Sequence, residues 1–376
     1  MSDEMKVTVF WGPTNKFFEL FNSDDGISLA DVAYDIDDKH KTFRVVGIRE
    51  TSKEIDELFY ELVYASAEDF CSISAHCIEN FSSVLQQIDT KHLYVNNPPK
   101  RVYSAIRRLF PKLEEEIYEY PTIDCEMLRR IKQNYSTAII GQEEVLRRLL
   151  AMLYQLSKDK HRPIVLLFYG DSGVGKTETA KFLSKCLGGD LLRKQFSLFQ
   201  NNEYSSYLFG GKHSDSSFAR ELLGRETNIV LLDEFDKANS VFYSAFYQLF
   251  DEGVFEDTNY RCNFGNGLII CTSNYQSDKE ILDKLGEAIY SRFNAVIGFN
   301  KLSIDDMKRV IEMVIGDEAS KFTDSELSPN DIDKIYNRML AFAPKLRGVR
   351  NIKNLVSELF SLVAVDRLFE KEDINS

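Results

Sequence analysis

The sequence predicts an α/β protein: a parallel sheet with helices on both faces, preceded by a separate α+β unit and followed by a small helical unit. Three observations lead to this prediction. Near-continuous apolar runs alternate with helical segments from about residue 122. The strand-like runs stop after about Lys301, and the remainder has helical periodicity. The chain has 376 residues, which is long for one domain, so we expect units at 1–121, 122–300 and 301–376.

The composition is that of an ordinary globular protein, with 44% hydrophobic and 28% charged residues. No apolar run reaches the roughly 20 residues that a membrane-spanning helix needs, and the start lacks the pattern of a secretory leader. We therefore expect a cytoplasmic protein with no membrane contact. The six cysteines form no CxxC pair, and residues 71 and 77 would share a helix face poorly. A metal site at Cys71, His76 and Cys77 is therefore disfavoured.

The net charge of −13 is unevenly distributed. Residues 1–121 hold 13 Lys+Arg and 22 Asp+Glu, a net of −9, whereas the remainder holds 33 and 37, a net of −4. An acidic unit opposes contact with nucleic acid, so we expect this unit to recognise one or more proteins. A local basic run is the exception, and we expect it to form a solvated helix face or an interface strip: Lys100, Arg101, Arg107, Arg108 and Lys112.

In the first third, strands are expected at 6–12 and 41–48. Residues 52–88 show helical periodicity with one or two breaks. The sequence NNPP at 96–99 predicts a turn or an extended entry to the helix that follows. The acid-rich stretch 113–124 is typical of a linker.

The next unit contains five strand-like runs separated by helical segments. Such runs, apolar almost throughout, are typical of a parallel sheet that is buried on both faces. The runs are PIVLLFYG, RKQFSLF, NIVLLDEF, GLIICTSN and NAVIGFN, at 163–170, 193–199, 228–235, 267–274 and 294–300.

The first of these runs leads into the pattern G-x-x-x-x-G-K-[ST], formed by Gly170, Gly175, Lys176 and Thr177. Glycines let a loop aim several backbone N–H groups at phosphate oxygens, and the helix that begins at Lys176 adds its positive end. Lys176 would neutralise phosphate charge, and the Thr177 hydroxyl would hold Mg²⁺. We expect ATP and Mg²⁺ to bind at Gly170, Asp171, Ser172, Gly173, Val174, Gly175, Lys176, Thr177 and Glu178.

Two acids, Asp233 and Glu234, end the run NIVLLDEF. Alone, this pattern is a weak signal, because many strands end in solvent. Downstream of a phosphate loop it indicates that Asp233 assists the metal and that Glu234 activates the attacking water.

Six segments together resemble the Clp-type AAA+ ATPases, especially the second ATPase module of the Clp disaggregases. The resemblance covers residues 123–365, about two-thirds of the chain, whereas residues 1–121 resemble no family that we can name. The segments are IIGQEEVLRRLLAML, GDSGVGKTETAKFL, IVLLDEFDKANSVFYSAFYQLFDEGVFED, IICTSN, YSRFNAVIGFN and GVRNIKNLV.

This resemblance implies an AAA+ fold with a helical lid and assigns roles to further residues. Ile140 and Gly141 would lie beside the adenine, and Asn274 would be the first sensor. Arg292 resembles the arginine finger that reaches the γ-phosphate of a neighbouring subunit, and Arg350 resembles the second sensor on the lid. A finger supplied in trans implies self-association into a ring or an open helical assembly, by resemblance a homo-hexamer with head-to-tail interfaces.

Each of these assignments has an alternative. Asn274 is also a plausible turn cap, Arg292 an ordinary surface arginine, and Arg347 a rival for the role given to Arg350. All three alternatives stay open at the level of sequence.

The sequence departs from the Clp pattern at YLFGGKHSDSSFAREL, where the family carries an aromatic pore loop. The stretch is several residues shorter and lacks the aromatic tip, so we do not expect processive threading. Tyr207 and Phe209 precede the glycines, and we expect them to pack against the body. Torsins are a Clp-related precedent without that aromatic, and they change the state of a partner.

Three functions remain compatible with the sequence. The expected one is an ATPase that remodels or regulates a partner protein complex. The alternatives are a nucleic-acid-associated AAA+ switch or loader and a nucleotide-dependent scaffold with little turnover. The acidity of residues 1–121 opposes the first alternative, and the presence of Glu234, Asn274 and Arg292 opposes the second.

Overall fold

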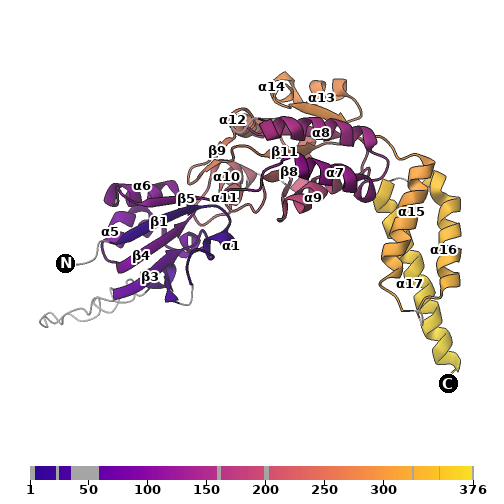
Figure 1. Cartoon of the computed structure of the whole chain (residues 1–376), viewed down its shortest axis with the longest axis horizontal. Coiled ribbons are helices and arrows are strands. Elements are labelled where there is room, and N and C mark those ends of the chain that lie inside the picture. Colours follow the sequence, from indigo (N-terminus) through magenta and orange to yellow (C-terminus); the bar gives the residue numbers. More distant parts are fainter. Residues whose placement is uncertain are drawn as a thin grey trace, which may run out of the picture.

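The structure is a computed structural model with two parallel sheets and a group of C-terminal helices (Figure 1). The strand expected at 41–48 lies outside the residues that the structure describes, so its existence is untested. The described residues are 5–22, 25–34, 59–158, 162–198, 203–323, 326–346 and 348–374.

The first sheet has the strand order β2-β3-β4-β1-β5, and every neighbouring pair is parallel. We call the described residues from 5 to 117 the N-terminal unit. Our expectation of an α+β unit was wrong in this respect, because its strands and helices alternate as in an α/β fold. The strands are β1 (Lys6–Trp11), β2 (Ile27–Ser28), β3 (Phe59–Ala65), β4 (Asp89–Asn96) and β5 (Glu114–Ile117).

Two of these strands correct the sequence analysis. β3 lies inside the stretch 52–88 that we expected to be helical, and its side chains alternate between exposed and more buried positions. β5 lies inside the expected linker. It is an edge strand bonded to β1 alone, so its exposed glutamates carry no burial cost. Between and after these strands lie α1 (Thr14–Phe17), α3 (Asp69–Ser72), α4 (Ala75–Glu79), α5 (Phe81–Leu85) and α6 (Lys100–Leu109).

The second sheet has the order β12-β6-β11-β8-β7, again with all neighbours parallel. All five expected runs contain a strand, and β8 and β11 are buried along their whole length. The strands are β6 (Ile164–Tyr169), β7 (Leu192–Gln195), β8 (Ile229–Asp233), β11 (Leu268–Thr272) and β12 (Ala295–Gly298).

Helices cover both faces of this second sheet, so the central part of the chain has three layers. One face packs on α7 (Cys125–Ala138), α8 (Glu143–Lys158) and α9 (Lys176–Leu187) through one apolar cluster. The other face belongs to a second cluster, rich in phenylalanine. Its elements include α10 (Glu203–Phe209), α11 (Phe218–Leu223), α12 (Tyr247–Glu252), α13 (Asp278–Leu285) and α14 (Glu287–Tyr290).

The C-terminal helices are α15 (Ile304–Ala319), α16 (Pro329–Phe342) and α17 (Gly348–Ile374), which share a separate apolar core. Capping boxes start two of them: Ser303 and Asp306 for α15, and Ser328 and Asp331 for α16. In Figure 1 these helices lie on the side of the central layers opposite the N-terminal unit. Among the described residues, no helix combines the length and apolar character that a membrane crossing requires.

The N-terminal unit contacts a hairpin of the central layers, formed by β9 (Val254–Glu256) and β10 (Arg261–Asn263). The backbone N–H of Lys100, at the start of α6, donates to the carbonyl of Asn259 at 2.7 Å. The ammonium of Lys100 lies 2.7 Å from a carboxylate oxygen of Glu256 and 2.6 Å from the carbonyl of Asp257. The first turn of α6 is therefore anchored on the tip of this hairpin.

Candidate functional site

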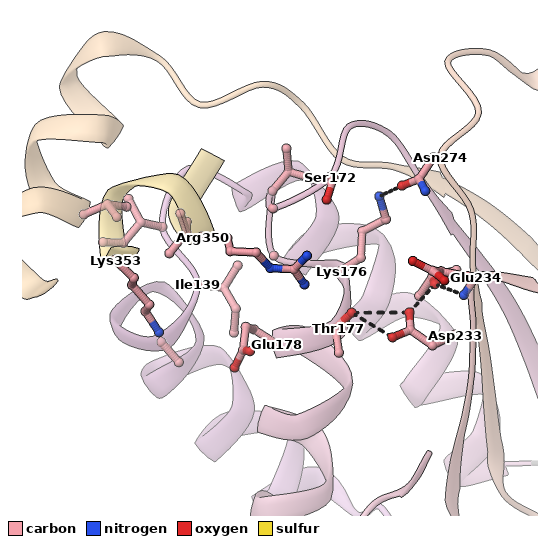
Figure 2. Close-up of a pocket in the computed structure, with 18 of the residues that line it drawn as sticks. Ile139, Ser172, Lys176, Thr177, Glu178, Asp233, Glu234, Asn274, Arg350 and Lys353 are labelled. Atoms are coloured by element: carbon pink, nitrogen blue, oxygen red, sulfur yellow. Dashed lines mark hydrogen bonds between the residues drawn. The ribbon is translucent and has the colours of Figure 1, made fainter. Parts of the chain in front are cut away.

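A pocket of about 390 Å³ opens between the carboxyl edge of the second sheet and the start of α17 (Figure 2). Ligands of open parallel sheets bind at this edge, because the loops that follow the strands gather there. The loop after β6 forms one wall of the pocket, the ends of β7, β8 and β11 contribute polar side chains, and α15 and α17 form the opposite wall.

The phosphate loop depends on glycine at both ends. Gly170 has φ 129°, and a Cβ there would lie 2.6 Å from the carbonyl oxygen of Phe299. Gly175, with φ 108°, occupies the N-cap position of α9. These are left-handed conformations that L side chains rarely adopt, so the loop can turn back over the start of α9 only with glycine at these positions.

Lys176 is the most buried cation of the site, with 7% of its surface exposed. Its ammonium donates to the carbonyls of Gly170 at 2.6 Å and Asp171 at 2.8 Å, and to Oδ1 of Asn274 at 3.2 Å. Burial lowers the pKa of this ammonium from 10.5 to about 8, although nearby Asp233 partly opposes the shift. The asparagine at the end of its strand and the lysine of the loop are therefore in direct contact in the folded chain.

Thr177 and Asp233 are also brought together. The Thr177 hydroxyl lies 3.4 Å from both carboxylate oxygens of Asp233, which is 5% exposed. A hydroxyl and a carboxylate are the hard oxygen ligands that Mg²⁺ prefers, and Mg²⁺ commonly takes few protein ligands beside phosphate and water. The described residues contain no group of three or more His, Cys, Asp or Glu arranged for a metal. The pair fits Mg²⁺ bound together with a nucleotide.

Glu234 has a left-handed backbone, with φ 54°, although it is not glycine. Its N–H donates to the Thr272 hydroxyl at 2.9 Å, and its carboxylate accepts a bond from Gln195 at 3.1 Å. Strained backbone of this kind persists only where surrounding contacts hold it. The turn directs Glu234 into the pocket beside Asn274 (Figure 2).

The helix α17 touches the phosphate loop directly. The N–H of Val349 donates to the carbonyl of Gly173 at 3.0 Å. A Cβ on Gly348 would lie 3.0 Å from the carbonyl oxygen of Ser172. Figure 2 shows the guanidinium of Arg350 directed toward Thr177, so this arginine can reach a phosphate held by the loop.

Most of the predicted site residues line this one pocket. They include Ile140, Ser172, Gly173, Val174, Gly175, Lys176, Thr177, Glu178, Asp233, Glu234, Asn274 and Arg350.

Gly141, Gly170, Asp171 and Arg292 are not among the lining residues. Gly141, with φ 74°, packs closely on Asp306 at the start of α15. Asp171 pairs with Lys301 at 3.2 Å. Arg292 follows α14, outside the pocket, and Arg347 lies outside the described residues.

Several polar groups of the pocket were missed. The guanidinium of Arg193 bonds Asp233, with Nε 2.9 Å from Oδ2, and Gln195 bonds Glu234. Arg193 and Gln195 are two residues apart near the end of β7, so they share a face. This spacing of two polar residues on one face of a strand was the sequence signal that could have identified them as site residues. Lys353, one turn beyond Arg350 on α17, also lines the pocket.

The parallel sheet, the phosphate loop and the acidic strand end are typical of a P-loop nucleotide-binding domain. Residues 161–327 match the family described as AAA domain (Cdc48 subfamily). Two relatives, from Staphylococcus aureus strains USA300 and NCTC 8325 / PS 47, are each named "ATP-dependent Clp protease ATP-binding subunit ClpL". Each is 30% identical over 220 residues, which cover 52% of this chain and 31% of the relative. In this region the chain is similar to the Clp-type AAA+ ATPases, in agreement with the resemblance seen in the sequence, and it spans about a third of the length of these relatives.

The lowered pKa of Lys176 generates a first prediction. Only the charged ammonium could bind phosphate, and its pKa of about 8 means that the charge is lost as the pH rises through this value. Nucleotide affinity should therefore fall above pH 8, approaching about tenfold per pH unit well above it. Calorimetry at pH 8 in buffers of different ionisation enthalpy should show net proton uptake on binding. A Lys176→Arg variant that still binds should lose the dependence, and equal wild-type affinity at pH 7 and 9 would contradict the assignment.

A second prediction concerns the contact between α17 and the loop. Gly348→Ala places a Cβ against the Ser172 carbonyl at φ 77°, and a left-handed alanine costs about 1–2 kcal/mol. Nucleotide affinity, measured by fluorescence titration, should fall together with the melting temperature. Gly316→Ala is the control, since a Cβ there meets nothing within 4 Å inside α15. Equal effects of both substitutions would show that the loop contact is unimportant.

Proposed function

We propose that this chain binds ATP with Mg²⁺ and hydrolyses it to remodel or regulate a partner protein complex. The convergence of Lys176, Thr177, Asp233, Glu234 and Asn274 on one pocket is the observation that carries the proposal. We also propose the divisions 1–121, 122–300 and 301–376. A cytoplasmic location stays a prediction.

Different residues of the pocket would bind the phosphates and the metal ion. The backbone N–H groups of the loop and the Lys176 ammonium would bind the β- and γ-phosphates. Thr177 and Asp233 would hold Mg²⁺, and the bound metal ion would neutralise part of the charge of the phosphates. Arg350 would contact phosphate from α17, so that nucleotide state and the angle of the C-terminal helices are linked.

The proton of the attacking water would go to the Glu234 carboxylate. General bases act within hydrogen-bond reach of that proton, and Glu234 is turned into the pocket by its left-handed backbone. Asn274 would orient the same water from the end of β11. Gln195 already donates to Glu234 and would restrict the orientation of the carboxylate.

We further propose that Arg292 acts on the pocket of a neighbouring copy in a homo-hexameric ring. Arg292 lies outside its own pocket, beyond α14. An arginine that stabilises transition-state charge must reach the γ-phosphate, and Arg292 does not line the pocket of its own chain, so it would reach this phosphate in the pocket of another copy. Head-to-tail contacts of this kind close into a ring when the rotation between copies closes, and they form an open helix when it does not.

The partner would be engaged through the N-terminal unit and not by threading. The hydroxyl of Tyr207 donates to Glu221 at 2.6 Å, and this ring packs against the central core. Phe209 is 42% exposed, and its ring centroid lies 6.4 Å from that of Phe242. The prediction that both aromatics pack on the body therefore holds for Tyr207 and only in part for Phe209.

The shortened loop is also tied to other elements. The carbonyl of Phe209 accepts bonds from the Thr258 N–H at 3.0 Å and from its hydroxyl at 2.8 Å. Nε2 of His213 lies 2.8 Å from the carbonyl of Ile73 in the N-terminal unit. These bonds favour a loop that passes motion to the N-terminal unit over one that grips an unfolded chain.

The contacts of the basic run on α6 support the preference for a protein partner over a nucleic acid. Lys100 is paired with Glu256 and Arg101 with Glu79, while Arg108 donates to the Ser82 hydroxyl. Cations already paired within the chain contribute less to phosphate contacts.

Loss of the loop lysine should abolish nucleotide binding. Lys176→Ala removes a buried cation, a change that costs about 2–5 kcal/mol when the bound partner is a charged group. Calorimetry should detect no ATP binding, whereas Lys185→Ala, an exposed position near the end of the same helix, should bind normally. Unchanged affinity in Lys176→Ala would refute the assignment.

The Glu234→Gln variant should bind ATP as the parent protein does but should lose ATP turnover, because it lacks the carboxylate that accepts the proton of the attacking water. A turnover assay on the parent protein is the reference, and a parent protein with no ATP turnover would be a nucleotide-dependent scaffold.

The trans role of Arg292 can be tested by mixing two inactive variants. Arg292→Ala should bind ATP normally but lose about 10³-fold or more in turnover. Lys176→Ala retains Arg292, so mixed assemblies of the two variants should contain intact pockets facing intact fingers. ATPase activity of the mixture should exceed the sum of the separate activities. A mixture with no gain, in samples shown by light scattering to co-assemble, would argue for action within one chain.

A further inference from the structure

We propose that Tyr247 and Asp251 are positioning residues that hold the guanidinium of Arg292 in one orientation, with one terminal nitrogen left for a phosphate of the neighbouring copy. The inference rests on the proposed trans role of Arg292. It adds two residues, from α12, that the sequence motifs do not include.

Three contacts hold the guanidinium. Nε of Arg292 donates to Oδ2 of Asp251 at 2.9 Å. One terminal nitrogen, Nη1, donates to the carbonyl of Ala288 in α14. The central carbon of the guanidinium lies 4.1 Å from the centroid of the Tyr247 ring. A carboxylate, a carbonyl and an aromatic face thus fix the position of the group from three sides.

The spacing in the sequence explains how α12 supplies two of these contacts. Tyr247 and Asp251 are four residues apart, so they lie on the same face of the helix, one turn from each other. Arg292 comes from the segment after α14, and its backbone N–H bonds the carbonyl of Ile289. We call the Tyr247 ring, the Asp251 carboxylate and the Ala288 carbonyl the seat of Arg292. It is formed by two elements, α12 and α14, that are distant in the sequence and meet only in the folded chain.

The hydrogen bonds that the Arg292 guanidinium already makes indicate which of its nitrogens is free to bind a phosphate. A guanidinium has N–H groups on Nε and on both terminal nitrogens. Within the described part of the chain, bonds are present at Nε and Nη1, and none is present at Nη2. The Arg292 side chain is 25% exposed, and Nη2 is the nitrogen that we assign to an acceptor from outside the chain.

The seat is better explained by orientation than by stability. The Asp251 side chain is 47% exposed, and exposed ion pairs contribute little to folding stability. A free arginine side chain has many rotamers, and it loses rotamer entropy when it is ordered. Holding that side chain before the phosphate arrives removes part of this cost from the transition state, which is how positioned groups accelerate reactions.

The test uses the assembled full-length protein and three single variants. Tyr247→Leu removes the aromatic face, Tyr247→Phe keeps it, and Asp251→Ala removes the acceptor of Nε at an exposed position that folding should tolerate. Tyr247→Leu and Asp251→Ala should lower kcat about tenfold to hundredfold, with KM for ATP and oligomer size unchanged. Tyr247→Phe should stay within about twofold of the parent, because a phenyl face also attracts a cation.

Double variants separate this role from a structural one. In an Arg292→Ala background, Tyr247→Leu and Asp251→Ala should cause no further loss of turnover, because there is no guanidinium left to position. Additive losses, or a normal kcat in the single Asp251→Ala variant, would overturn the inference. If Tyr247→Leu does not fold, Asp251→Ala still tests the inference. Normal turnover of Arg292→Ala itself would instead refute the proposed finger, which is a different failure.

Discussion

The buried ammonium of Lys176 is the interaction on which the site depends. A cation with 7% exposure needs acceptors, and here the loop carbonyls of Gly170 and Asp171 supply them together with Asn274. The carbonyls can face the ammonium only because the loop turns through glycine conformations. The same turn presents the Gly173 carbonyl to the N–H of Val349 at the start of α17. The burial of Lys176 and the attachment of the C-terminal helices therefore both depend on the conformation of this loop.

The sequence could predict what is encoded locally. The five strands of the second sheet were confirmed because each is an apolar run that ends at a polar residue. The convergence of Lys176, Asp233 and Asn274 was foreseeable for the same reason, since parallel strands end at one edge.

Other features depended on contacts between distant segments and could not be predicted. β5, with three glutamates, forms a strand because β1 offers it a free edge. Arg193 reaches Asp233 only across two neighbouring strands. The seat of Arg292 joins residues some 40 positions apart, and the periodicity of a sequence does not indicate that such distant residues are in contact.

The anchoring of α6 on the hairpin tip has a consequence for communication across the molecule. Lys100 is bonded to Asn259 and Glu256, and β9 follows α12 after Gly253 alone. The helix that bears Tyr247 and Asp251 is therefore separated by one residue from the strand to which the N-terminal unit is fastened. A displacement of that unit would therefore move α12, and with it the carboxylate and the aromatic ring that orient the guanidinium of Arg292.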